Sequence, residues 1–211
     1  AKALAAQQKS GNKVDAFGVA RLDEALVLRK AGITTPIVLL EGFFSSTDLP
    51  LLVEHNLQTI VHNKTQLEVI CQANQQALGG RISVWLKVDT GMHRLGINPD
   101  EVEYFYSQLT SAPIVNDELC LISHLSHADD QHSPVTEQQL FLFNTISESV
   151  ECKRSLANSA GTLAWPNTHL DWIRPGLMIY GINPITESGT EKAPALLPTA
   201  IQPVMTLKSS I

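Results

Sequence analysis

Charged residues around the end of one predicted strand are the strongest sign of chemistry in this sequence. Residues 84–88 form an apolar run typical of a buried strand, and turn-forming residues end it at 89–91. Lys87 lies inside the run, and Arg94 follows the turn. Because α/β folds keep their active sites at the carboxyl ends of parallel strands, both cations are candidate site residues. A solvated loop arginine and a strand-end lysine paired to a neighbour are the alternative.

Three later strands also end on residues that can bind a ligand. His124 closes a strand at 119–124, Asn158 and Ser159 follow one at 154–157, and Arg174-Pro175-Gly176 follow one at 171–173. The last two loops, which hold Asn158, Ser159, Gly176 and Leu177, offer backbone N–H groups and a hydroxyl, as phosphate sites do. Alone, His124 fits a structural histidine and Ser159 a helix cap. Together these strand ends favour a ligand that carries a phosphate.

The elements that must position these residues alternate between strand and helix. Strands are predicted at 16–20, 37–40, 59–62, 82–88, 119–124, 154–157 and 171–173. Helices are predicted at 1–10, 22–30, 47–55, 63–78, after 98, from 136 to 146 and at 161–165. Since each strand but the last precedes a helix, we expect a parallel sheet covered by helices.

Local signals mark where several helices begin. Asn63 with Gln66 predicts a capping box, for a helix that buries Leu67, Ile70, Cys71 and Leu78. Residues 98–101 (Asn-Pro-Asp-Glu) predict a capped start for a helix that buries Val102, Phe105 and Leu109. Thr136 is expected to cap a helix with Leu140, Phe143 and Ile146 facing inward.

The predicted fold class is α/β, as a (β/α)8 TIM-type barrel. Seven strands fit this barrel with its first strand absent, and we expect that strand to lie before Ala1 because the chain opens on a helix. An open doubly wound sheet is the alternative, but no GxGxxG turn follows the first strand. We assign residues 1–198 to the barrel. Residues 199–211, where 202–209 alternate like a strand, are assigned to the start of a C-terminal β-rich domain.

Composition excludes several classes of protein. The chain has 211 residues, of which 44% are hydrophobic, enough for a substantial core. No apolar run is long enough to span a membrane, and no signal peptide is visible. The net charge of −6 without a basic block argues against nucleic acid. Three cysteines without a CxxC pair and histidines without ligand spacing argue against a metal site. The sequence predicts a soluble cytoplasmic protein.

At the strand-end residues the sequence resembles the alanine racemases, pyridoxal 5′-phosphate (PLP) enzymes that supply D-alanine for bacterial peptidoglycan. The segments that carry the resemblance are 86–96 (LKVDTGMHRLG), 123–124, 157–159 and 172–181, supported by 18–20 and 40–44. It covers essentially the whole chain. It implies a barrel followed by a β-rich domain, PLP as cofactor, a small amino-acid substrate, and an active site formed between the two subunits of a homodimer.

The resemblance also implies roles for the candidate residues. Arg174 matches the arginine at the pyridine nitrogen of PLP. Because arginine keeps its proton, it would leave that nitrogen unprotonated, which favours racemisation over transamination or decarboxylation. His124 matches a histidine beside the ring. Arg94 matches an arginine near the phenolic oxygen of PLP and the substrate carboxylate, and Lys87 a lysine that is carbamylated in some members and holds that arginine.

The phosphate cradle and the remaining catalytic groups complete the implied site. Ser159, Gly176 and Leu177 match the cradle, with Asn158 beside it. The family's Schiff-base lysine would lie before Ala1, and its second base, a tyrosine, beyond Ile211. Since racemisation needs a base on each face of the substrate carbon, we expect this chain to be a fragment that is inactive alone. A broad-specificity or serine racemase, a non-catalytic PLP-binding barrel and a phosphate-binding aldolase or isomerase barrel are the alternatives.

Overall fold

The computed structural model describes residues 1–6, 14–185 and 201–204. These fall into two compact units, which are described separately. The first unit comprises Ala1–Asp89 and Arg94–Leu121, and the second comprises Thr90–His93 and Ile122–Ile211.

The first unit is built on four parallel strands. They are β1 (Phe17–Val19), β2 (Ile37–Leu39), β3 (Leu57–Val61) and β4 (Val84–Lys87). Neighbouring strands pair in register, for example Gly18 with Val38 and Ile60 with Trp85. The pairs β1-β2, β2-β3 and β3-β4 are all parallel, so helical crossovers must join successive strands.

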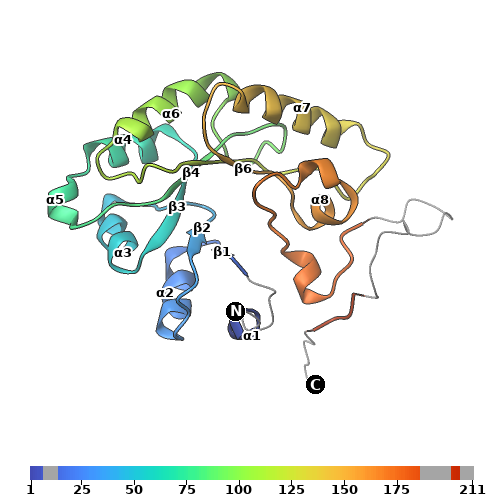
Figure 1. Ribbon diagram of the computed structural model, residues 1–211, viewed down its shortest axis with the longest axis horizontal. Coiled ribbons are helices and arrows are strands. Elements are labelled where there is room, and N and C mark those ends of the chain that lie inside the picture. Colours follow the sequence, from blue (N-terminus) through green and yellow to red (C-terminus); the bar gives the residue numbers. More distant parts are fainter. Residues whose placement is uncertain (7–13, 186–200, 205–211) are drawn as a thin grey trace, which may run out of the picture. The chain divides into compact units, whose positions relative to one another are not determined.

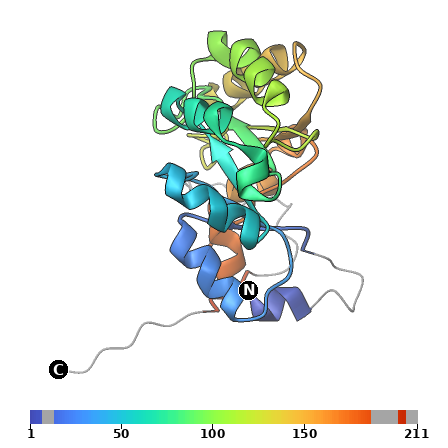
Figure 2. The ribbon, with the colours of Figure 1, turned by 90° about the vertical axis from the view of Figure 1, so that its left-hand side faces the viewer.

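The helices of the first unit are α1 (Lys2–Ala6), α2 (Leu22–Lys30), η2 (Ser46–Asp48), α3 (Leu49–Glu54), α4 (Lys64–Gln72), α5 (Gln75–Leu78), η3 (Pro99–Glu101) and α6 (Val102–Ser111). Those that lie between β1 and β4 in the chain supply the crossovers, whereas α1 precedes β1 and η3 and α6 follow β4. Helices α2, α3, α4 and α6 lie along the outer side of the strands, as Figure 1 shows. Helix α4 packs against α6, and the two lie side by side in Figure 1 and Figure 2. Val102, Phe105 and Leu109 form the buried stripe of α6, as predicted.

The predicted helix over residues 63–78 is interrupted. Helix α4 ends at Gln72, where Ala73 is extended, and α5 begins after Asn74. The Asn74 side chain accepts hydrogen bonds from the N–H groups of Gln76 and Ala77, so it caps a new helix instead of continuing the old one. Cys71, in the last turn of α4, is exposed, whereas the periodicity predicted it to be buried.

A buried glutamine joins two strand ends in the first unit. Asn63 caps α4 through Gln66 N–H at 2.9 Å, but the Gln66 side chain does not return to Asn63 as a capping box requires. Its Oε1 accepts from His62 N–H at 2.9 Å, and its Nε2 donates to the carbonyls of Glu41 and Phe43 at 3.3 and 3.0 Å. Gln66 therefore ties the loop after β2 to the end of β3.

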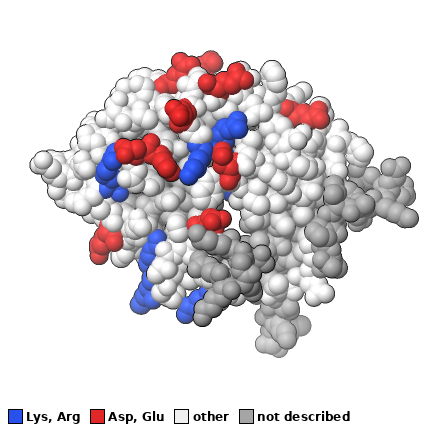
Figure 3. Space-filling view, in the orientation of Figure 1, with Lys and Arg blue, Asp and Glu red and all other residues white. Residues whose placement is uncertain are grey.

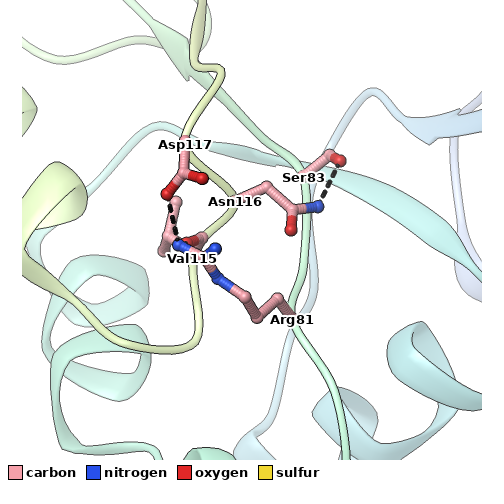
Figure 4. A network of polar contacts seen from close by, with 5 residues as sticks. All are labelled: Arg81, Ser83, Val115, Asn116 and Asp117. Carbon is pink, nitrogen blue, oxygen red and sulfur yellow. Dashed lines mark hydrogen bonds and ion pairs between the residues drawn. The ribbon is translucent and has the colours of Figure 1, made fainter.

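A second polar network lies just before the N-terminal end of β4 (Figure 4). The Arg81 guanidinium donates to the Val115 carbonyl at 2.9 and 2.5 Å and forms a 2.7 Å ion pair with exposed Asp117. Asn116 donates to Ser83 Oγ at 2.8 Å. These contacts fasten the 115–117 loop to the segment that enters β4, which gives them a structural role.

The second unit continues the alternation of strand and helix. Strand β5 (Cys120–Ile122) ends in it, followed by α7 (Val135–Ser147), β6 (Lys153–Ser155), α8 (Ser159–Ala164), η4 (Pro166–Thr168) and η5 (Leu177–Tyr180). The strand order in the sheet is that of the sequence, from β1 to β6. The α/β class with parallel strands is thus confirmed in the described residues.

In the second unit two predictions fail and a third holds in part. Residues 171–173 make one bridge, Ser155 to Trp172, and no strand, because they lie between left-handed Leu170 and Pro175, which has no N–H to donate. Thr136 is not a cap: α7 begins after Pro134, and Thr136 is fully buried inside it. Among the residues expected to face inward on α7, Phe143 is buried, whereas Leu140 and Ile146 are half-buried.

The predicted C-terminal β-rich segment lies largely outside the described residues. Residues 201–204 have no strand structure, and 205–211 are not described. Among the described helices, none is both long and apolar enough to cross a membrane. In the upper half of the face in Figure 3, each group of basic side chains borders an acidic one, so neither charge forms a large patch there.

Candidate functional site

Arg174 is the centre of the polar site in the second unit. Its Nη1 donates to Ser155 Oγ and its Nη2 to the Ser123 carbonyl, both at 2.5 Å, and Nη2 also lies 3.3 Å from the Leu156 carbonyl. Its backbone N–H donates to the Ala157 carbonyl at 2.9 Å. The guanidinium is therefore fixed against the ends of β5 and β6.

Burial lowers the pKa of Arg174 from 12.5 to about 10. The residue as a whole is only half-buried, but its guanidinium group is the enclosed part. Removal of a charge from water disfavours the charged form, and this explains the direction of the shift. A pKa near 10 still leaves Arg174 protonated at neutral pH, so it acts as a cation and a hydrogen-bond donor.

His124 lies next to this guanidinium. Its Nδ1 is 3.5 Å from Arg174 Nη2. Because an arginine side chain can only donate, Nδ1 is the acceptor in this contact, and the proton of a neutral imidazole then sits on Nε2. Arg174 thus sets the tautomer of His124, and the pair presents two nitrogen groups, one from the loop after β5 and one from the segment after the Trp172 bridge.

The four residues predicted to bind phosphate are connected. Ser159 Oγ accepts hydrogen bonds from the N–H groups of Gly176 at 2.8 Å and Met178 at 3.3 Å. Asn158 caps α8 through Gly161 N–H at 2.9 Å and donates to the Leu125 carbonyl at 3.2 Å. Leu177 begins η5 beside Gly176. The Ser159 hydroxyl therefore joins the loop after β6 to the segment that follows Arg174.

Two donors in this cluster have no acceptor among the described residues. They are the Ser159 hydroxyl, whose oxygen is already accepting twice, and the Leu177 N–H at the start of η5. A Cβ built at Gly176 would meet no atom within 4 Å, so the space beside that backbone is open. Free N–H and O–H donors at a helix start suit an anion.

Lys87 and Arg94 belong to the first unit and differ in environment. Lys87 is 6% exposed within β4, and its charge helps lower the pKa of nearby His62, although burial of the His62 ring is the larger cause. The His62 Nε2 lies 3.1 Å from the Glu41 carbonyl. Arg94 is exposed and makes no hydrogen bond or ion pair with any described residue. The predicted support of Arg94 by Lys87 stays a prediction.

The second unit brings together six of the eight predicted site residues. They form an Arg174–His124 pair and a cluster of Asn158, Ser159, Gly176 and Leu177. The sequence analysis missed Ser123 and Ser155, which hold the guanidinium. Their position at strand ends, one of them directly before His124, was the available signal. No group of three or more His, Cys, Asp or Glu side chains that could hold a metal lies within the described ranges.

Comparison with known proteins places this arrangement in a family. Residues 2–184 match the model of the alanine racemase N-terminal domain. The chain is 48% identical over 198 residues to the alanine racemase of Haemophilus influenzae, covering 94% of this chain and 52% of that protein. It is 45% identical to the biosynthetic alanine racemase of Escherichia coli K12, and the match covers 93% of this chain and 53% of that protein.

Solved structures agree with the sequence relatives. The crystal structure of biosynthetic alanine racemase from Pseudomonas aeruginosa matches with a TM-score of 0.77 and 38% identity, over 88% of this chain and 50% of that one. The crystal structure of alanine racemase from E. faecalis matches with a TM-score of 0.77 and 30% sequence identity, over 94% of this chain and 52% of that one. The chain spans about half the length of the relatives it matches. From its second residue to residue 184, this chain belongs to the alanine racemase N-terminal domain family.

Proposed function

We propose that this chain forms the PLP-binding part of a racemase that interconverts L- and D-alanine. The observation that carries the proposal is the protonated Arg174 guanidinium, held by Ser123 and Ser155 beside His124. The relatives named as alanine racemases support the choice of substrate. Supply of D-alanine to peptidoglycan and a homodimer in the cytoplasm are part of the same proposal.

The residues of the second unit fit PLP. The Ser159 hydroxyl and the Leu177 N–H have no acceptor among the described residues, and the open space beside Gly176 lets a phosphate approach the backbone closely. The Arg174 guanidinium would face the pyridine nitrogen. A phosphate cradle and a cation held on successive loops match the two polar ends of the cofactor.

PLP, when bound, supplies an electron sink that makes the Cα–H bond of an amino acid more acidic. Arg174 donates a hydrogen bond but keeps its own proton, because its pKa of about 10 lies well above neutral pH. A ring nitrogen that faces it therefore stays unprotonated. Arg174 would thus limit the electron withdrawal by the ring and so favour return of the proton to Cα over side reactions.

The family resemblance also assigns roles to Arg94 and Lys87 of the first unit. The exposed Arg94 guanidinium has donors to offer the carboxylate of an amino-acid substrate. Lys87, buried in the preceding strand, would hold it after carbamylation, because only the modified side chain carries a negative charge. Both assignments rest on the family resemblance.

The proposal is tested on the intact protein with Arg174→Lys. Lysine offers three donors from one nitrogen, so it does not reach the Ser123 and Ser155 oxygens and the pyridine position together. We expect bound PLP by absorbance, rapid loss of optical rotation with L-alanine, and a fall in kcat/KM of at least about tenfold in the variant. Exposed Arg21→Lys is the matched control and leaves kcat/KM unchanged.

Other outcomes would point to other functions. Unchanged activity in Arg174→Lys contradicts the role at the pyridine nitrogen. Bound PLP with no racemisation of any amino acid favours a non-catalytic PLP-binding barrel, and equal rates with serine favour a broad-specificity racemase. We expect no turnover from the 211-residue chain alone, because the resemblance assigns the Schiff-base lysine and the second-base tyrosine to positions outside it.

A further inference from the structure

Gln139 is a fully used hydrogen-bonding centre inside the second unit. It lies on α7 and is 1% exposed. Its Nε2 donates to the His124 carbonyl at 3.0 Å and to Thr90 Oγ1 at 3.2 Å. Its Oε1 accepts from Ser126 N–H at 2.9 Å and from Ser126 Oγ at 3.1 Å. Both N–H groups and both lone-pair positions of the carboxamide are therefore occupied.

These partners fix the backbone that follows the His124 side chain. The His124 carbonyl can only accept and the Ser126 N–H can only donate, so only one orientation of the Gln139 amide satisfies both. The amide closes a bridge across residues 124–126. The peptide plane that follows the imidazole-bearing residue thus has a defined orientation.

The Gln139 carboxamide is also connected, through Thr90, to Ser123, whose carbonyl holds Arg174. Thr90 Oγ1 accepts from Gln139 and also shares a 2.7 Å hydrogen bond with Ser123 Oγ, in which either hydroxyl can donate. The Ser123 carbonyl in turn accepts from Arg174 Nη2 at 2.5 Å. The chain Gln139–Thr90–Ser123 therefore ends on the guanidinium, and the bridge over residue 124 ends on its imidazole partner.

A structural role alone does not explain a carboxamide at this position. A leucine would fill a similar volume without the free-energy penalty of burying an amide. Every partner of the Gln139 side chain lies in the loops at 90 and 124–126, and none lies on its own helix. The side chain serves those loops.

We propose that Gln139 is a positioning residue for the His124–Arg174 pair, setting the loop geometry that keeps the His124 Nδ1 facing the guanidinium. The proposal rests on the proposed function only in taking this pair to face the cofactor. It predicts an effect on the pair itself, which is measurable without substrate.

The experiment compares Gln139→Leu with two matched controls in the intact protein, with and without PLP. Gln138→Leu changes the exposed neighbour on the same helix, and Gln66→Leu removes the equivalent buried bridge of the first unit. The readouts are the ¹⁵N shifts of the His124 ring, assigned with His124→Gln, and the kcat and KM for L-alanine.

We expect Gln139→Leu to change the His124 signal from the single Nε2–H tautomer to a mixture. Misplacement of the pair should lower kcat by about 100-fold with little change in KM. Gln138→Leu should change neither, and Gln66→Leu should lower stability while leaving the tautomer signal as in the wild type. A wild-type tautomer and kcat in folded Gln139→Leu would overturn the proposal, as would an equal tautomer change in Gln66→Leu.

A second pair of variants covers the case in which Gln139→Leu does not fold. Thr90→Val removes the hydroxyl of the relay at nearly constant volume, and Thr90→Ser restores it. We expect Thr90→Val to show the tautomer mixture and the lower kcat, and Thr90→Ser to show the wild-type tautomer and kcat. Equal results in the two variants would refute the role of the Thr90 hydroxyl. If Arg174→Lys leaves activity intact while the tautomer still responds to Gln139→Leu, the proposed function fails and the positioning role stands.

Discussion

Replacement of Ser155 by alanine tests whether the Arg174 guanidinium depends on its buried partners. Ser155 is fully buried, accepts from Arg174 Nη1 at 2.5 Å and donates to the Trp172 carbonyl at 2.9 Å. A hydrogen bond to a charged group contributes about 2 kcal/mol and a neutral one about 1 kcal/mol. We therefore expect Ser155→Ala to lower the free energy of unfolding by about 3 kcal/mol.

Urea unfolding followed by tryptophan fluorescence measures this loss. The m-value should stay constant, because the substitution changes the stability of the folded state and not the surface that unfolding exposes. Ser111→Ala is the control: Ser111 also donates to a carbonyl, that of Ser107 at 2.8 Å, but from an exposed position, so its loss should stay below about 0.5 kcal/mol. A loss in Ser155→Ala no larger than in this control would refute the argument that the guanidinium is held by buried acceptors.

Two further predictions concern charge and backbone. Because burial lowers the pKa of Arg174 from 12.5 to about 10, its charge destabilises the folded state below pH 10, and this penalty is relieved as the pH rises through 10. The free energy of unfolding of the wild type, relative to that of Arg174→Met, should thus rise by about 1.4 kcal/mol between pH 8 and 11. Urea unfolding at each pH measures this difference, and a difference that does not change with pH contradicts the lowered pKa. Gly42→Ala should lower stability by about 3 kcal/mol, because its φ is +78° and a Cβ would lie 2.4 Å from Gln66 Nε2 and from the Ile60 carbonyl. Gly79→Ala, with φ +71° but open space, should lose only about 1 kcal/mol, and equal melting shifts in the two variants would exclude the clash.

The parts of the fold that follow from local pattern were predictable. The apolar runs of β1 to β5 and the stripe Val102, Phe105 and Leu109 follow from side-chain periodicity, and Asn98 with Glu101 forms the capping box of a typical helix start. The helix over 63–78 was predicted too long, because Asn74 offered a competing cap inside a periodic segment. Periodicity describes a helix face but not a side chain that bonds to its own backbone.

The contacts within the site were less accessible to sequence reasoning. Arg174 meets the Ser123 carbonyl across 51 residues and Ser155 across 19, and no local signal encodes such pairs. On α7 the prediction favoured Leu140 and Ile146, yet Thr136, Gln139 and Ser147 are buried beside Phe143. At Gln139 the buried residue is polar because its carboxamide bonds the His124 carbonyl and the Ser126 N–H of the adjoining loop. A prediction that looks only for periodic apolar residues cannot find a buried helix face made of polar ones.

The two buried glutamines have a consequence for how these loops can be moved between proteins. Gln66 holds the loop after β2 from a helix that begins 22 residues beyond Gly42, and Gln139 holds residues 90 and 124–126 from well inside α7. Each loop therefore owes its conformation to a side chain outside its own sequence. A loop transplanted into another barrel would lose its shape unless the glutamine travelled with it, so the transferable module is the loop together with the first turns of a helix.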